Sequence, residues 1–403
     1  MKRRSLLGAA AVLPLGAGAA ARPGPAPWIP TWVAMPQLTE PANLPPLPLV
    51  QVTLRQTVHT STAGSGLRVR FSNAFGGTAL PIAAVSVARP LGGQAGVAAI
   101  EPGSSRPVTF AGRPFVTVPV GAQAVSDPVP FDVPARSNLT VTVYLAAGQD
   151  SPAITSHPGS RTTSYLLPGD HHDDPDLPGA TAVDHWYLLS GVEVRAAGTA
   201  TVILGDSLTD GRGSTTNANN RWPDQLAARF PRTPAILNQA AGGNRVLQDG
   251  LGPSVLARLD RDVLALGRTG RVILFEGVND IGTAPATAAD QQAVGDELLA
   301  AYQQIVVRCQ ARELPVAGAT ITPFGGNTGY DDPGGLREAT RQRVNQQIRS
   351  GRLFDAVLDF DAAVRDPGDP RRLWPAYDTG DHLHLTPDGY RAIAAAVPLR
   401  LLR

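Results

Sequence analysis

Ser207 is the residue of this sequence best placed to act as a nucleophile. It lies in the segment Leu204-Gly205-Asp206-Ser207-Leu208-Thr209-Asp210-Gly211, directly after the apolar run 201–204. The apolar run predicts a buried strand, and the glycines at both ends of the segment allow the chain to turn sharply. A serine on such a turn lies at the rim of a sheet, where its hydroxyl can meet a substrate. Taken alone, the segment is equally compatible with an ordinary helix cap.

Two histidines could serve as a general base for Ser207. They are His382 and His384, because the other five of the seven histidines lie in the first half of the sequence. A neutral imidazole can accept the serine proton, and a carboxylate on its second nitrogen stabilises the imidazolium that forms. Asp381 lies three residues before His384, on the same side of one turn, whereas its neighbour His382 points away. We therefore assign His384 as the base and Asp381 as its orienting partner; a polar loop capping the last helix is the alternative.

Acyl transfer also needs hydrogen-bond donors for the developing oxyanion. The backbone N–H of Ser207 is one candidate. Gly243 can bring a second backbone N–H close because it has no side chain, and Asn279 can offer a side-chain amide. A plain turn at Gly243 and a helix cap at Asn279 are the structural alternatives.

These residues follow predicted strands in the second half of the chain. Strands are expected at 200–204, 235–238, 271–276, 315–320 and 356–360, and helices near 219–230, 254–266, 288–312, 335–350 and 387–402. Such alternation predicts a parallel sheet with helices on both faces, whose sites lie at the carboxyl ends of its strands. The serine, glycine, asparagine and histidine segments can therefore converge at one edge of the sheet.

The first half has a different pattern. Residues 67–71 and 139–145 alternate strictly between apolar and polar, and residues 82–87 and 115–120 also predict strands. Alternation with one apolar face is typical of a packed antiparallel sheet. We expect a β-sandwich, jelly-roll-like accessory domain over 28–196 and an α/β catalytic domain over 198–403.

The composition excludes several classes of protein. Of 403 residues, 43% are hydrophobic, and 35 basic against 34 acidic residues leave a net charge of +1. This balance argues against a nucleic-acid partner or a strongly basic membrane binder. The single cysteine, Cys309, excludes an intrachain disulfide and lies in a helical pattern, so we expect it to fill the core.

Residues 1–21 have the pattern of a secretory signal peptide: basic, then apolar, then rich in alanine and glycine. The Arg3-Arg4 pair fits twin-arginine export, and a general secretory signal is the alternative. The apolar part is too short to span a bilayer stably. We expect a secreted or periplasmic protein without stable membrane insertion after removal of the signal.

The order Gly-Asp-Ser-Leu, Gly-Gly-Asn, Gly-Val-Asn-Asp and Asp-x-x-His resembles the four blocks of the GDSL, or SGNH, hydrolase family over roughly 199–403. The resemblance implies a flavodoxin-like three-layer α/β/α domain that hydrolyses esters without metal or cofactor. It implies Ser207 as nucleophile, Gly243 and Asn279 as oxyanion donors, and Asp381 and His384 as the rest of the triad. His382, where relatives often have a small residue, is then a candidate for the pocket lining. The first half is similar to a β-rich domain in some secreted bacterial members.

The expected function is a secreted serine esterase acting on short acyl esters such as acetyl groups, carried by small molecules or polysaccharides. A lipase or arylesterase is the first alternative, and a non-catalytic carbohydrate-binding surface protein is the second. Residues 170–176 match no zinc or calcium loop and predict a solvated acidic loop. Residues 323–330 are expected to form a pocket wall, and Trp186 and Tyr187 to pack between the domains. The sequence leaves the natural ester and the oligomeric state open.

Overall fold

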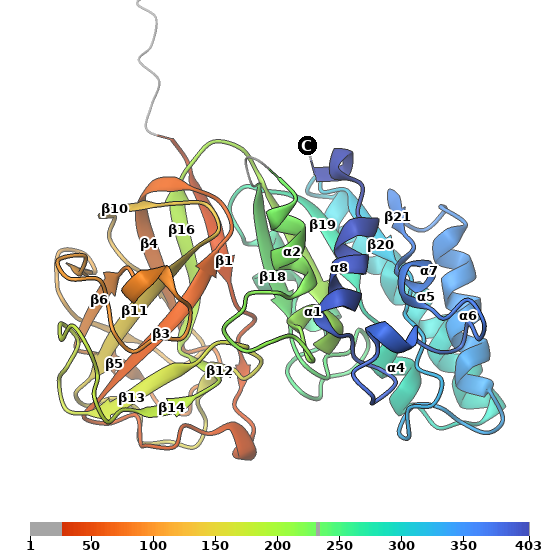
Figure 1. The fold of residues 1–403 in the computed structure, drawn as a ribbon, viewed down its shortest axis with the longest axis horizontal. Helices are drawn as coiled ribbons and strands as arrows, with labels where there is room; N and C mark the ends of the chain where they lie inside the picture. The colour runs from red at the N-terminus through yellow and green to blue at the C-terminus, as the bar shows by residue number, and fades with distance from the viewer. Residues whose placement is uncertain (1–25, 231–233, 403) are drawn as a thin grey trace, which may run out of the picture.

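The computed structural model describes residues 26–230 and 234–402 (Figure 1). The expected signal peptide, residues 1–21, lies outside the described residues. A β half, red to yellow-green in Figure 1, lies beside an α/β half, green to blue. The last antiparallel strand ends at Arg195 and the first parallel strand begins at Ala200. The domain boundaries 28–196 and 198–403 stay a prediction.

The α/β half is built on a five-stranded parallel sheet in the order β18-β17-β19-β20-β21. The strands are β17 (Ala200–Gly205), β18 (Ala235–Ala240), β19 (Thr269–Phe275), β20 (Val316–Ala319) and β21 (Ala356–Leu358). This is the doubly wound, flavodoxin-like order, in which the connections reverse direction at the first strand. The predicted fold of this half is confirmed.

Eight α-helices connect or cover these strands within the described ranges. They are α1 (Ser207–Asp210), α2 (Trp222–Ala228), α3 (Val255–Leu259), α4 (Val278–Thr283), α5 (Ala288–Gln310), α6 (Leu336–Arg349), α7 (Phe360–Val364) and α8 (Pro387–Ala396). Because parallel crossovers are right-handed, α2 covers one face of the sheet and α3, α5 and α6 cover the other. Helix α8 packs against α2, which places it on the first face (Figure 1).

Two predicted helices are shorter than expected. The helix expected at 387–402 ends at Ala396, because Pro398 has no N–H and its ring disfavours helical geometry in the residue before it. A separate 3₁₀ turn, Leu399–Leu402, follows. The helix expected at 254–266 is α3 followed by a π-helical turn, Asp260–Leu264. Neither difference moves a predicted site residue.

The β half contains two large antiparallel sheets. The first joins β1 (Trp28–Val33), β16 (Leu189–Arg195), β4 (Gly64–Ser72), β10 (Val129–Val133) and β9 (Gln123–Val125). The second joins β14 (Thr181–Val183), β13 (Ser164–Pro168), β3 (Val52–Thr60), β11 (Ser137–Leu145), β6 (Ala84–Ala88) and β7 (Arg106–Pro107). Smaller sheets comprise β15 (Trp186–Tyr187), β12 (Thr155–His157) and β2 (Gln37–Leu38), and the pair β5 (Leu80–Ile82) and β8 (Val116–Val118).

Side chains of both large sheets meet in one hydrophobic core, for example Val69 of β4 and Val141 of β11. The predicted antiparallel character of this half is confirmed, whereas the sandwich and jelly-roll descriptions stay predictions. The single strand expected at 82–87 is wrong. The chain leaves β5 after Ile82 and enters β6 at Ala84, because the two strands pair with different partners, β8 and β11.

The two halves share side chains. Ile29 and Val33 of β1 are buried in the core of the α/β half, and β1 runs beside β18 (Figure 1). Trp186 packs against the α/β half as expected, since the guanidinium carbon of Arg221 lies 5.7 Å from its ring centroid. Tyr187 does not do so. Its ring belongs to the core of the β half, and its hydroxyl donates to the Asn43 carbonyl.

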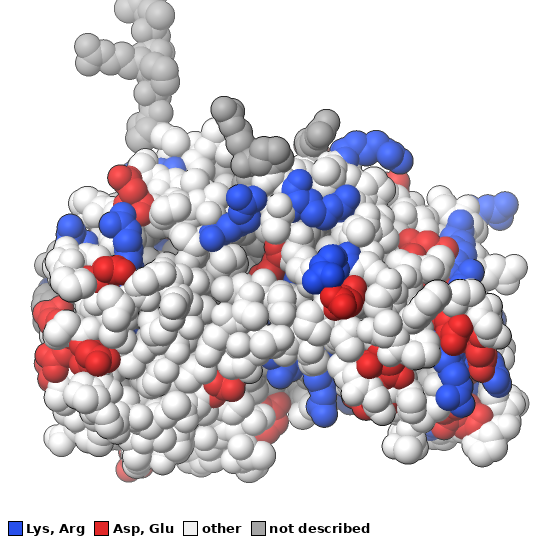
Figure 2. Space-filling model, viewed as in Figure 1, with Lys and Arg blue, Asp and Glu red and all other residues white. Residues whose placement is uncertain are grey.

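Figure 2 shows the charged side chains on one face of the molecule. Acidic and basic side chains are interspersed on the face shown in Figure 2, in keeping with a net charge of +1. Within residues 26–230 and 234–402, no helix has the length and apolar character needed to cross a membrane.

A buried ion pair joins the halves beneath α1. His157 Nε2 lies 2.9 Å from Asp210 Oδ1, and His157 Nδ1 lies 3.0 Å from the Met35 carbonyl oxygen. Both partners are acceptors, so the ring binds them with both of its N–H groups. Burial opposes ionisation of Asp210, but the charge and hydrogen bond of His157 outweigh it and lower the pKa of Asp210. Asp210 Oδ2 also accepts the backbone N–H of Gly242 at 3.2 Å.

We expect His157→Leu to lower the free energy of unfolding by about 3–5 kcal/mol, because it strands the buried Asp210 carboxylate without its partner. Urea unfolding followed by circular dichroism measures the change. The control is His172→Leu, which removes a half-buried ring from an ion pair with the exposed Asp170 and should cost at most about 1 kcal/mol. Equal effects of the two substitutions would contradict this account of the interface.

Candidate active site

Ser207 lies at the first position of α1, immediately after β17. The preceding residue, Asp206, caps this short helix by accepting the Leu208 N–H on its side chain at 2.9 Å. Within the described residues, the Ser207 N–H itself donates to no other group. Gly211 ends the helix with φ of 90°, a left-handed conformation that glycine adopts without strain. The turn therefore presents both the hydroxyl and a free amide N–H of Ser207 at the carboxyl edge of the sheet.

Ser207, His384 and Asp381 form a continuous hydrogen-bonded chain. His384 Nδ1 lies 2.6 Å from Asp381 Oδ2, so this nitrogen carries the ring proton. His384 Nε2 is then the acceptor of the Ser207 hydroxyl at 2.8 Å. Asp381 Oδ1 accepts the backbone N–H groups of His384 and Leu383 at 2.8 and 3.0 Å, and the Thr379 hydroxyl at 3.0 Å. The three residues chosen from sequence spacing thus lie in the geometry of a nucleophile, a base and an orienting carboxylate.

The surroundings of the site determine the protonation states of His384 and Asp381. Burial is the largest effect on His384 and lowers its pKa below 6.5, while the Asp381 carboxylate opposes the shift. The positive charges of Arg212 and Arg161 lower it further. Burial also opposes ionisation of Asp381, but the hydrogen bonds from His384 outweigh it and hold the Asp381 pKa well below its usual range. At neutral pH the site therefore holds a neutral imidazole against an ionised carboxylate.

Two further candidate donors, Gly243 and Asn279, line the same cavity as Ser207. Gly243 adopts φ of +70°, and a Cβ there would lie 2.5 Å from Leu251 Cδ1, so a side chain would not fit. The Gly243 N–H donates to no group among the described residues. Asn279 lines the same cavity at the start of α4. Gly243 and Asn279 thus lie with Ser207, as the sequence predicted.

The Asn279 amide is oriented by two neighbours. Its Nδ2 lies 2.7 Å from the Asn244 carbonyl oxygen, which can only accept, and its Oδ1 accepts the Tyr330 hydroxyl at 2.6 Å. The amide group facing Asn244 must therefore be the NH₂ group, which leaves one of its two hydrogens unassigned. Sequence reasoning missed the roles of Tyr330 and Asn244 as supports of this amide.

The cavity at Ser207 has a volume of about 430 Å³ and is lined by both halves of the molecule. The β half supplies Gln37, Glu40, Asn43, Pro158, Gly159, Arg161 and His185. The α/β half supplies Ser207, Asp210, Arg212, Gly242, Gly243, Leu251, Asn279, Tyr330, Leu383 and His384. The sequence gave no signal for the contribution of the β half, because nothing in it shows which antiparallel loop reaches the edge of the parallel sheet.

Two expectations about the lining have different outcomes. The loop at 323–330 does form part of the wall through Tyr330, and Asn327 Nδ2 donates to the Asp381 carbonyl at 2.8 Å. His382 does not line the cavity. Its Nδ1 lies 2.6 Å from Asp378 Oδ2, and φ of 60° turns its side chain away from that of His384.

The loop at 170–176 carries its histidines in exposed ion pairs. His171 pairs with Asp174, and His172 pairs with Asp170. Among the described residues, no group of three or more histidine, cysteine or acidic side chains is arranged to hold a metal ion.

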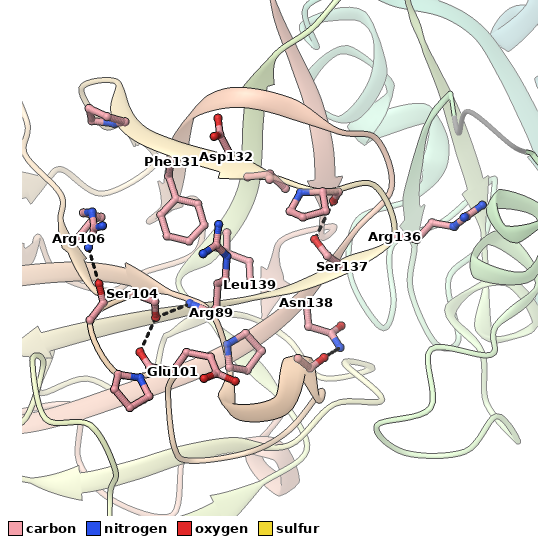
Figure 3. A pocket seen from close by; sticks show the side chains of 17 residues that line it. Arg89, Glu101, Ser104, Arg106, Phe131, Asp132, Arg136, Ser137, Asn138 and Leu139 are labelled. Atoms are coloured by element: carbon pink, nitrogen blue, oxygen red, sulfur yellow. Dashed lines mark hydrogen bonds between the residues drawn. The ribbon is translucent and has the colours of Figure 1, made fainter.

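A larger cavity of about 820 Å³ lies within the β half (Figure 3). Its serines are not activated, because the Ser104 hydroxyl donates to the Glu101 carbonyl and the Ser137 hydroxyl donates to the Pro134 carbonyl. The Arg89 guanidinium carbon lies 5.4 Å from the ring centroid of Phe131 and occupies its face (Figure 3). This cavity therefore does not compete with the one at Ser207 as a catalytic site.

The GDSL-like lipase/acylhydrolase family matches residues 203–392. Similar solved structures include a GDSL-like lipase from Bacteroides thetaiotaomicron VPI-5482, which is 17% identical over 49% of this chain and 85% of that chain, with a TM-score of 0.36. Another is Axe2, an acetylxylan esterase from Geobacillus stearothermophilus, which is 21% identical over 50% of this chain and 93% of that chain, with a TM-score of 0.37. No match was found among curated protein sequences. Residues 203–392 thus form a GDSL-like lipase/acylhydrolase domain, and through this domain the protein is a carboxylic ester hydrolase.

Proposed function

We propose that the protein is an exported serine esterase that removes short acyl groups, such as acetyl, from polyhydroxylated substrates including polysaccharides. The observation that carries the proposal is the hydrogen-bonded chain from Ser207 through His384 to Asp381. The signal-peptide pattern at 1–21 supports export.

In the proposed mechanism, Ser207 Oγ attacks the ester carbonyl while His384 Nε2 takes the hydroxyl proton. Asp381 stabilises the imidazolium and does not itself become protonated. The oxyanion accepts hydrogen bonds from the N–H groups of Ser207 and Gly243 and from the amide of Asn279. His384 then returns the proton to the leaving alcohol. A water molecule, deprotonated by the same histidine, releases the acid from the acyl-enzyme.

The character of the lining supports a short acyl group. Leu251, Leu383 and Tyr330 supply apolar surface, whereas most of the other lining side chains are polar or charged. Each methylene of a long acyl chain gains about 0.8 kcal/mol only where it meets apolar surface, and only three large apolar side chains, Leu251, Leu383 and Tyr330, line this cavity. Amides such as Gln37 and Asn43 can instead hydrogen-bond hydroxyl groups of a sugar-like alcohol. A lipase or arylesterase remains the second candidate through the family itself.

Ser207→Ala should lower kcat/KM for p-nitrophenyl acetate by at least about 10³-fold, because it removes the nucleophile and leaves the donors in place. Parallel assays with p-nitrophenyl butyrate and octanoate, and acetate release from acetylated xylan, rank the substrates. Wild type should prefer acetate over octanoate. The control, Ser350→Ala, removes an exposed hydroxyl at the end of α6 and should leave the rates unchanged.

Full activity of Ser207→Ala would contradict the mechanism. A preference for octanoate would favour the lipase reading. Binding of acetylated xylan without turnover of any ester by folded wild type would favour a carbohydrate-binding protein.

The acid limb of the pH profile of kcat/KM should have its midpoint below pH 6.5. His384 acts as a base only when neutral, and its pKa is lowered from 6.5, so activity persists below that pH and is lost as the imidazole becomes protonated. Asp381→Asn removes an interaction that raises the His384 pKa. This variant should therefore move the midpoint to still lower pH while reducing the maximal rate. A wild-type midpoint above pH 6.5 would contradict this assignment.

A further inference from the structure

Two arginines, one from each half of the molecule, border the cavity at Ser207. Arg161 lies in the loop that follows β12, and Arg212 lies one residue beyond the glycine that ends α1. The Arg212 N–H donates to the Ser207 carbonyl at 2.9 Å, which fixes the start of this side chain beside the serine. The cavity is thus flanked by guanidinium groups on both of the surfaces that form it.

Among the described residues, neither guanidinium forms an ion pair with an acidic side chain, although the charge of Arg161 helps to lower the pKa of Asp210. Within residues 26–230 and 234–402, no ion pair includes Arg161 or Arg212, and the buried Nε of Arg161 has no hydrogen-bond partner. Arg221, on the other side of Asp210, shows the usual arrangement, because its Nε donates to the Asp224 carboxylate at 3.0 Å. A buried donor without an acceptor is unfavourable. Because both arginines line the cavity and neither forms an ion pair within the described residues, an anionic group on a ligand can pair with them.

The acidic side chains of the cavity already have partners within the protein. Glu40 accepts hydrogen bonds from the amides of Gln37 and Asn43, and Asp210 is paired with His157. The Asp381 carboxylate is held by His384. Each acidic group at the cavity thus has a partner other than Arg161 or Arg212, so a carboxylate on the ligand can pair with these two guanidinium groups.

Both charges act at the reaction centre, because each lowers the pKa of His384. The backbone at Arg161 is also held in an uncommon conformation, with φ of 51°. The Asn217 N–H donates to its carbonyl at 2.9 Å and keeps the loop against the α/β half. Residues with such uncommon backbone conformations persist where the surrounding structure fixes them, often at functional sites.

We propose that Arg161 and Arg212 select esters that carry a carboxylate close to the scissile acyl group, as in acylated sugar acids. The planar guanidinium fork matches a carboxylate by two parallel N–H···O bonds. This inference rests on the proposed esterase activity and names its substrate class. A carboxylate on the alcohol portion would then lie between the two halves while its ester group reaches Ser207.

The test compares two acetate esters that differ mainly in charge: 4-acetoxybenzoate, which is anionic, and methyl 4-acetoxybenzoate, which is neutral. The kcat/KM ratio of the anionic to the neutral ester is measured for wild type, Arg161→Gln, Arg212→Gln and the double variant. The matched control is Arg312→Gln, an exposed arginine between α5 and β20, at the amino-terminal edge of the sheet opposite Ser207. Acetylated polygalacturonate and its methyl-esterified form repeat the comparison on a polymer.

The ratio should fall about tenfold or more in each single variant and further in the double variant, the range expected when a hydrogen bond to a charged group is lost. It should not change in Arg312→Gln. An unchanged ratio in the arginine variants would overturn the proposal, and so would an equal loss on both esters. Absence of Ser207-dependent hydrolysis of either ester by wild type would instead overturn the esterase function itself. Because Arg212 is exposed, its variant keeps the test valid even if Arg161→Gln fails to fold.

Discussion

The pairing of Asp210 with His157 is the interaction on which the rest of the site depends. Asp210 ends α1, the short helix that begins with Ser207, and its carboxylate is almost completely buried. One oxygen binds the imidazole of the β half and the other holds the Gly242 N–H, next to Gly243, the proposed oxyanion donor. Gly159 packs so closely that a Cβ there would lie 1.7 Å from the Asp210 carboxylate. One buried charge thus fixes the serine helix, the glycine turn and the loop that carries Arg161.

The surroundings separate the carboxyl groups near the serine into two classes. Burial raises the pKa of Asp206 to about 7 and that of Asp280 to about 6, and it raises the pKa of Glu276 well above its ordinary value. Asp381 is shifted the other way by its hydrogen bonds with His384. Carboxyl groups whose pKa values are shifted in opposite directions can serve different roles. Asp206 and Asp280 accept backbone N–H groups at turns, whereas the side-chain oxygens of Glu276 have no hydrogen-bond partner. Asp381 keeps the charge that the proposed mechanism needs beside an imidazolium.

The hydrogen-bonded chain of the candidate site was predictable because each part is local in sequence. Ser207 follows an apolar strand, and Asp381 and His384 share one turn, so spacing alone identified three residues that the structure brings together. The parallel sheet with helices on both faces also followed from alternating strand and helix patterns, whereas its flavodoxin-like character came from the family resemblance. The sequence analysis considered only the two histidines of the second half of the chain. It therefore missed His157 of the first half, whose Nε2 lies 2.9 Å from Asp210 Oδ1. Contacts between distant segments leave no periodic pattern in the sequence, so Arg161 and Gly159 could not be placed beforehand.

The same contacts mean that the two halves are not independent parts joined by a linker. Ile29 and Val33 fill the core of the α/β half from the other side of the boundary. The Ile236 N–H of β18 donates to the Ser61 hydroxyl, and the Arg136 guanidinium donates to the Phe230 carbonyl. Removing the β half would expose apolar side chains of the parallel-sheet core to water and leave the Asp210 carboxylate without the His157 imidazole. The β half is therefore a structural component of the candidate site, because residues of both halves line the cavity at Ser207.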